Sequence, residues 1–173
     1  MTLAWPERVL RAVAEWPAAL LVVAEIVVLS MGVISRYVLQ QPLTWSDELA
    51  SVLFLWLAML GAVVAMQHSE HMRLTVFVAR LSEGKRRKVE SLVACLTVLF
   101  CAALLWPALA HMDEQWVILT PALEIPDALR VAAVVVGLGL MLLQSLLQLS
   151  RAARGPELLW SLAWLVLVGG ALH

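Results

Sequence analysis

Few residues in this chain of 173 combine a reactive side chain with a position from which it could do chemistry. Glu25 is the foremost, because it is the only charged residue well inside a long apolar stretch. An ionisable group there is costly, so it predicts either a proton or cation site or a hydrogen-bonded group that fixes helix register. No second acidic or basic residue lies at that depth, although Gln144 is expected at a similar level. This favours the structural interpretation of Glu25.

Two other pairs of residues are of the types found in metal or redox sites, but their positions in the sequence do not favour such a site. His68 and His71 are three residues apart and could share a helical face, yet the sequence indicates no third ligand nearby. Cys95 and Cys101 fall inside one apolar stretch, where they are expected to behave as small apolar side chains. No histidine lies in the middle of an apolar stretch, so a bis-histidine haem has no support. We therefore expect no cofactor, no metal site and no enzymatic activity in this chain.

The composition requires lipid as the main solvent. Of the residues 62% are hydrophobic and only 14% are charged, and a water-soluble fold of this size could not bury so much apolar surface. The sequence predicts an all-α integral membrane protein with four transmembrane helices. We expect a single membrane domain over residues 1–155, with spans at about 17–39, 47–67, 89–111 and 129–149.

Two further segments flank the expected bundle. Residues 3–15 mix apolar and charged side chains with helical spacing, which predicts a short amphipathic helix on the membrane surface. Residues 156–173 form an apolar tail. It is short for a span, and the sequence leaves open whether it is an interfacial helix or a fifth or connecting span.

Lysine and arginine are distributed unequally between the two sides of the expected bundle. Ten lie in the N-terminal segment, the 68–88 loop and the residues after the fourth span, whereas only Arg36 and Arg130 lie on the opposite side. The positive-inside rule therefore places the N-terminus and the 68–88 loop in the cytoplasm. The opposite side carries an acidic rim of six carboxylates.

Two tryptophans and a glycine are candidates for structural contacts. Trp45 lies near the start of the second span and is expected to anchor it at the interface. Trp56 lies near the middle of that span, either facing lipid or contacting another helix. Gly61 follows it, and a glycine there could let another helix approach closely.

Before the fourth span, from Thr120 to Pro126, the chain reads Thr-Pro-Ala-Leu-Glu-Ile-Pro. Further motif residues precede this segment: Arg36, Tyr37, Pro42, Trp45, Asp47, Glu48, Trp56, Leu60, Gly61 and His71. The order and spacing of these residues resemble the small membrane subunit, the Q subunit, of tripartite ATP-independent periplasmic (TRAP) transporters, in which the segment before the fourth span follows a Thr-x-Ala-Leu-x-Ile-Pro pattern. The similarity covers roughly residues 17–150, but Arg73 and Thr75 occupy a stretch that is often acidic in the family.

The resemblance implies a scaffold role in the bacterial inner membrane. In this family a large permease subunit would hold the substrate and sodium sites, and a soluble periplasmic protein would deliver the substrate, commonly an organic acid. The small subunit would support the large one in a heterodimer and help to dock the binding protein. The candidate residues are then structural or subunit-interface residues: Glu25, Arg36, Trp45, Asp47, Glu48, Trp56, Gly61, His71, Thr120, Pro126 and Gln144.

Two other functions stay open at this point. One is an autonomous proton-coupled exporter with four helices that uses Glu25, although the long basic central loop and the strong charge asymmetry count against it. The other is a membrane anchor of a redox complex that binds haem or quinone, against which the missing mid-span histidines count.

Overall fold

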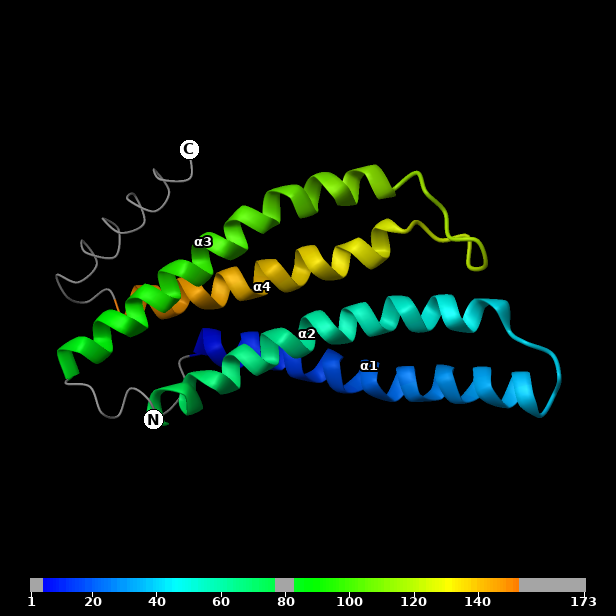
Figure 1. Ribbon diagram of the computed structural model, residues 1–173, viewed down its shortest axis with the longest axis horizontal. Coiled ribbons are helices and arrows are strands. Elements are labelled where there is room, and N and C mark those ends of the chain that lie inside the picture. The colour runs from blue at the N-terminus through cyan, green and yellow to red at the C-terminus, as the bar shows by residue number, and fades with distance from the viewer. Residues whose placement is uncertain (1–4, 77–82, 153–173) are drawn as a thin grey trace. The chain divides into compact units, whose positions relative to one another are not determined.

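The computed structural model describes residues 5–76 and 83–152, which form four α-helices in the order α1, α2, α3 and α4 (Figure 1). The helices run over Trp5–Tyr37, Thr44–Val76, Glu83–Gln115 and Ala128–Ala152. Each contains an apolar stretch long enough to cross a membrane, namely Ala12–Tyr37, Thr44–His68, Leu92–Gln115 and Ala128–Leu149. The predicted all-α membrane fold with four transmembrane helices is confirmed.

The first helix is longer than the sequence predicted. We expected a surface helix over residues 3–15 and a separate span from residue 17, but α1 is continuous from Trp5 to Tyr37 with Pro17 inside it. A proline removes one intrahelical hydrogen bond without obliging the helix to end, and apolar surroundings favour keeping the remaining bonds. Whether residues 5–15 lie on the membrane surface stays a prediction. The tail at 156–173 lies outside the described residues.

The connection between α1 and α2 is a short, tightly bonded turn. The amide of Val38 donates to Ile34 O at 2.8 Å, and that of Gln41 donates to Ser35 O at 3.1 Å. Gln40 takes a positive φ of 57°, the left-handed conformation that commonly ends a helix. The hydroxyl of Ser35 also donates to the carbonyl of Gln41. These bonds satisfy the last carbonyls of α1 and turn the chain back into α2.

The packing of the described residues falls into two units. The first contains α1, α2 as far as Ala65, α3 from Trp106, α4 as far as Gly137 and the two connecting loops between these parts. The second contains the remaining turns of α2, α3 and α4. Small side chains are frequent among the buried apolar residues. These are Ala14, Val28, Ala50, Leu60, Val63, Ala128 and Ala133 in the first unit, and Ala94, Cys95, Cys101 and Leu138 in the second.

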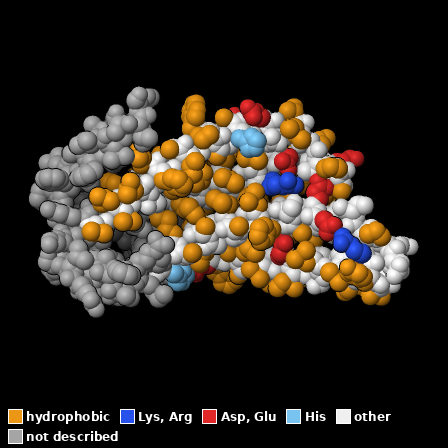
Figure 2. Space-filling view, viewed as in Figure 1, with side chains coloured by type: hydrophobic (Ala, Val, Ile, Leu, Met, Phe, Trp, Pro, Cys, Tyr) orange, Lys and Arg blue, Asp and Glu red, His pale blue; other side chains and the backbone are white. Residues whose placement is uncertain are grey.

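Most of the apolar surface of the helices points outward. Between 11% and 28% of the most apolar stretch of each helix is buried within the chain, and α1 has the smallest share. Figure 2 shows the exposed apolar side chains covering much of the visible face. Such a surface is unsuited to water and fits contact with lipid or with other membrane helices.

Glycines allow two close contacts between helices in the first unit. A Cβ added at Gly32 of α1 would lie 3.1 Å from the hydroxyl oxygen of Ser46 in α2. The contact at Gly137 of α4 is tighter, because a Cβ there would lie 2.9 Å from Cβ and 2.5 Å from Cε of Met59. By contrast, a Cβ at Gly61 would meet nothing within 4 Å. The approach of α4 to α2 therefore depends on Gly137, and Gly61 has no such role among the described residues.

We expect Gly137→Ala to destabilise the chain, whereas Gly61→Ala serves as the matched control and causes no loss. Overpacking of this kind typically costs about 1–3 kcal/mol, because Met59 Cβ cannot move without shifting the α2 backbone. Thermal unfolding in mild detergent measures the difference. Equal melting temperatures for the two variants would contradict the close contact between α4 and α2.

Candidate functional site in the loop between α3 and α4

The loop between α3 and α4 is a small hairpin rather than an open connection. Leu119 and Pro126 face each other as an antiparallel bridge. On one side of that pair the amide of Asp127 donates to Ile118 O at 2.8 Å, and on the other the amide of Thr120 donates to Ile125 O at 2.9 Å. The hairpin thus has a paired base and a tip formed by residues 121–124.

Thr120 holds the tip of this hairpin together. Its carbonyl accepts from the amide of Glu124 at 3.1 Å, and its hydroxyl oxygen accepts from the amide of Ile125 at 3.3 Å. Glu124 has a positive φ of 53°, which lets the chain turn back toward Ile125. Thr120 is only 6% exposed, so these groups cannot depend on water for hydrogen bonds.

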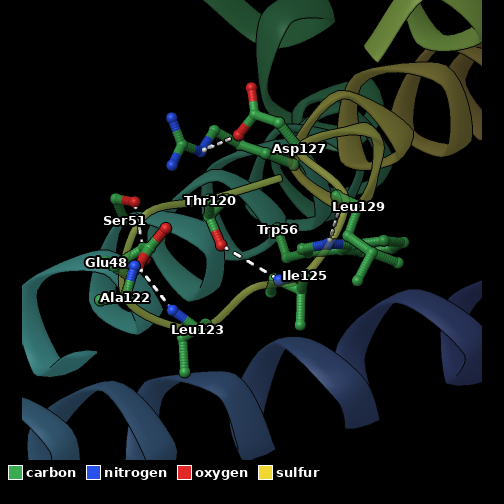
Figure 3. A network of polar contacts seen from close by, with 10 residues as sticks. Glu48, Ser51, Trp56, Thr120, Ala122, Leu123, Ile125, Asp127 and Leu129 are labelled. Carbon is green, nitrogen blue, oxygen red and sulfur yellow. Dashed lines mark hydrogen bonds and ion pairs between the residues drawn. The ribbon is translucent and has the colours of Figure 1, made fainter. Parts of the chain in front are cut away.

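Glu48, in the second turn of α2, fastens the hairpin tip to that helix. Its Oε2 atom accepts hydrogen bonds from the amides of Ala122 at 2.9 Å and Leu123 at 3.0 Å, as Figure 3 shows. The side chain of Thr120 and the guanidinium of Arg130 also interact with this carboxylate. Hydrogen bonds to an ionised acceptor are stronger than those between neutral groups. One carboxylate therefore accepts hydrogen bonds from two consecutive loop amides, which lie outside any helix and have no helical hydrogen bond.

The start of α4 is defined by the residues that close the hairpin. The carbonyl of Asp127 accepts from the amides of Arg130 at 2.9 Å and Val131 at 3.3 Å, which begins the helix. Asp127 Oδ1 lies 3.4 Å from Nε of Arg130. A carboxylate at this position also interacts favourably with the positive end of the helix dipole. Pro126 fits directly before this point, where it loses no helical hydrogen bond.

Trp56 joins α2 to the same helix start. Its indole N–H donates to the carbonyl of Leu129 at 3.0 Å (Figure 3). Trp56 lies eight residues after Glu48, about 12 Å further along α2. The chain from Leu123 to Leu129 therefore runs beside the apolar stretch of α2. Irregular backbone at such a level must find its hydrogen-bond partners within the protein.

Arg36 and Asp47 form a separate contact across the turn between α1 and α2. The guanidinium Nη2 lies 2.9 Å from Oδ2 of Asp47, and the two side chains are 50% and 72% exposed. An ion pair this exposed contributes about 0–1 kcal/mol. It helps to set the register of the two helices at their connected ends.

Six of the residues singled out from the sequence lie in this region: Arg36, Asp47, Glu48, Trp56, Thr120 and Pro126. Trp45 lies in the first turn of α2 and is half-buried. Gln144 belongs to the second unit and is 6% exposed. Glu25 lies in α1 and has no part in the network. The side chain of His71 is outside the described side chains.

Sequence reasoning missed how these residues are used. The sequence places Trp56 either against lipid or in a helix contact, and in the structure it bonds α4. From the sequence, Glu48 is only a structural or subunit-interface candidate, whereas in the structure it binds the loop some 74 residues later. The amides of Ala122 and Leu123 carry no side-chain signal. The Thr-x-Ala-Leu-x-Ile-Pro pattern was the available sign, since Thr120 and Pro126 are the residues that shape the hairpin.

The described residues offer little for chemistry. No group of three or more His, Cys, Asp or Glu side chains within 5–76 and 83–152 has an arrangement that could hold a metal ion. Cys95 and Cys101 are free and buried. The hydroxyls of Thr97 and Ser145 bond to carbonyls of their own helices, Val93 and Met141. The polar network at the loop is suited to holding a conformation.

Fold and network together define a multi-pass membrane protein whose charged groups fix a loop between helices. Residues 25–155, about three quarters of the chain, match the family described as "Tripartite ATP-independent periplasmic transporters, DctQ component". The chain belongs to this family. It is therefore a small TRAP transporter component of the inner membrane, as the sequence resemblance predicted.

Similar proteins are named TRAP transporter permease proteins, two of them small permease proteins. The chain is 35% identical over 66 residues to the sialic acid TRAP transporter small permease protein SiaQ of Vibrio cholerae, covering 38% of each chain. It is 37% identical over 87 residues to the sialic acid TRAP transporter permease protein SiaT of Haemophilus influenzae, covering 50% of this chain and 14% of SiaT. A putative TRAP transporter small permease protein of H. influenzae is 37% identical over 51 residues, 30% of this chain and 32% of that protein. The matches span well under half the length of these relatives.

We expect Glu48→Ala to release the hairpin tip, because the amides of Ala122 and Leu123 then lose their acceptor. Hydrogen exchange at these two amides should accelerate by about tenfold or more, because the loop can then open locally without breaking their hydrogen bonds to Glu48. Glu48→Gln, which keeps one side-chain oxygen, should fall between Glu48→Ala and the unaltered chain.

Asp47→Ala is the matched control for this prediction. It removes the neighbouring carboxylate, which bonds Arg36 instead of the hairpin. Exchange at Ala122 and Leu123 should be unchanged in this variant. Equal acceleration in the Asp47 and Glu48 variants would show that negative charge at the start of α2, and no specific bond, protects the loop.

Proposed function

We propose that this chain is the scaffold subunit of a TRAP transporter and binds a large permease chain side by side in the membrane. The main support is that the chain belongs to the DctQ family. In addition, no more than 28% of the apolar stretch of any of its four described helices is buried within the chain. Isolated four-helix bundles of this kind leave most of their surface for lipid or partners. The described mid-span positions hold one carboxyl group, Glu25, which is too little to bind and release a solute.

A larger permease is the partner that the relatives support. The region of SiaT that matches this chain is 14% of that protein, whose name designates a permease. A segment similar to this chain thus occurs within a much longer permease polypeptide. We infer that the present chain makes equivalent contacts with a separate large chain, forming a heterodimer.

Sodium and solute are assigned to the large chain in this proposal. The expected reaction is uptake of an organic acid coupled to sodium. The small chain contributes by widening the static part of the assembly against which the large chain moves. It would need no cofactor for this task.

The loop region is proposed to face the periplasm and to contact a substrate-binding protein there. Six carboxylates and two guanidinium groups lie at the connected ends of α1–α2 and α3–α4, an excess of four negative charges. Figure 2 shows many of these acidic and basic side chains near that end of the helices. Complementary charge on a binding protein would guide its approach. The Glu48 network would keep the hairpin in one conformation for that contact.

Co-expression with a large TRAP permease chain tests the scaffold role. We expect the two chains to co-purify in mild detergent in a one-to-one ratio, and only their combination to support solute uptake in vesicles with a binding protein and a sodium gradient. A monodisperse monomer that never associates with the permease would contradict the proposal. So would gradient-driven transport by the small chain alone.

The proposed orientation has its own test. Glu124→Cys places a thiol on the exposed hairpin tip, in a background where Cys95 and Cys101 are replaced by alanine. A membrane-impermeant maleimide added to cells with a permeable outer membrane should label this thiol. A cysteine at Ser69, on the opposite side in this orientation, should react only after the inner membrane is opened. The reverse pattern of labelling would overturn the assignment.

A further inference from the structure

Glu25 lies at the middle of the apolar stretch of α1. That stretch runs from Ala12 to Tyr37, so Glu25 is about 18–20 Å along the helix from either end. Neither end of a hydrocarbon layer some 30 Å thick is within reach of its side chain. A carboxyl group at such a depth needs a hydrogen-bond partner within the membrane.

The described part of the chain does not supply that partner. Oε2 of Glu25 is buried and accepts no hydrogen bond from any residue in 5–76 or 83–152, and the carboxyl group forms no ion pair with these residues. The side chain as a whole is half-buried, so Oε1 is the oxygen that a neighbouring helix could reach. The polar group of Trp56 is already committed to Leu129. A buried polar atom without a partner carries the full cost of its lost hydration.

Glu25 also marks a boundary on the surface of α1. On one side of it runs a buried seam that includes Ala14, Val28 and Ser35, spaced at seven-residue intervals or multiples of seven. On the other side runs an exposed apolar flank at helical spacing, formed by Val22, Ile26, Leu29 and Val33. These four side chains are 42%, 59%, 48% and 56% exposed. We call these four residues and Glu25 the Glu25 flank.

We infer that the Glu25 flank is the surface of this chain that packs against a helix of the large permease, and that this helix donates a hydrogen bond to Glu25. The inference rests on the proposed function. The partner assigned to the Glu25 flank is a membrane helix of the large permease that carries a hydrogen-bond donor, such as Ser, Thr, Asn, Gln or Arg, at mid-depth. Acyl chains offer no donor at this level. A second copy of this chain would bring another carboxyl toward the first, which is unfavourable when both are ionised.

The relative burial of the helices agrees with this choice. Only 11% of the apolar stretch of α1 is buried within the chain, compared with 17% to 28% for the other three. Between helices in lipid, association relies on close packing and on hydrogen bonds between polar side chains. Among the four helices, α1 therefore has the largest share of surface left for a partner, together with an acceptor that requires one.

Photo-crosslinking in membranes that contain both chains locates the contact. A benzophenone amino acid placed at Ile26 or Leu29 should give an adduct with the large permease. The same probe at Val27 or Met31, which are exposed and point away from Ile26 and Leu29 around α1 at a similar depth, should give none. Adducts from Val27 and Met31 alone, adducts with a second copy of the small chain, or the absence of adducts at Ile26 and Leu29 would each overturn the inference.

Substitution of Glu25 tests the hydrogen bond. Glu25→Leu should reduce the amount of large permease that co-purifies by about threefold to thirtyfold, the range that corresponds to one interhelical hydrogen bond in a membrane. Glu25→Gln keeps an acceptor oxygen and should stay within about threefold of the unaltered chain. Val27→Leu is the control for added apolar volume and should change nothing. The helix content of each variant purified alone checks folding.

The outcomes separate this inference from the proposed function. If the unaltered chain never binds the permease, the proposed function fails. If it binds and Glu25→Leu binds equally well, the scaffold role stands and the Glu25 contact is wrong. A loss as large in Glu25→Gln as in Glu25→Leu also contradicts the inference, since the amide oxygen can still accept the donated hydrogen.

Discussion

Backbone hydrogen bonding in a medium without water is the constraint on which this structure depends. Helices satisfy their own amides and carbonyls, but residues 116–127 between α3 and α4 cannot, and the tip of this loop contacts α2 at Glu48, within its apolar stretch. The Glu48 carboxylate supplies what the helical pattern cannot, by accepting from two consecutive amides. Thr120 accepts from the amides of Glu124 and Ile125, and the Leu119–Pro126 pair closes the base of the hairpin, so α4 begins at the level of Trp56 after a loop with several internal hydrogen bonds.

The helices pack through small side chains and close backbone contacts, because the solvent of the apolar helices is lipid. Lipid solvates leucine as well as a neighbouring helix does, so burying large apolar side chains gains little. Close backbone approach gains more, and Gly137 against Met59 is such an approach. The resulting bundle covers little of its own apolar surface. A subunit built in this way keeps most of its helix surface for lipid and for a partner chain, as expected of a transporter component.

The sequence predicts structure well where the signal is a long, continuous run of apolar residues. Apolar runs of more than twenty residues have one stable form in lipid, so the four helices were predictable, and charged residues marked their ends. The hairpin was not predictable in detail. Glu48 and Ala122 are 74 residues apart, and no periodicity records their contact. Gly61 and Gly137 likewise stand in similar apolar surroundings, yet only Gly137 has a neighbour close to it. Continuity of α1 through Pro17 also depends on surroundings that the local sequence does not describe.

Three carboxylates illustrate how setting decides the role of one chemical group. Asp47 is exposed and paired with Arg36, so water can replace its partner at little cost. Glu48 is half-buried and bonded to the hairpin, so its partner is internal and its loss frees a loop. Oε2 of Glu25 has no partner among the described residues, and the side chain lies in the middle of the apolar stretch of α1. A carboxyl group in that setting gains most from a donor at the same depth, which in the proposed assembly is a side chain on a helix of the large permease.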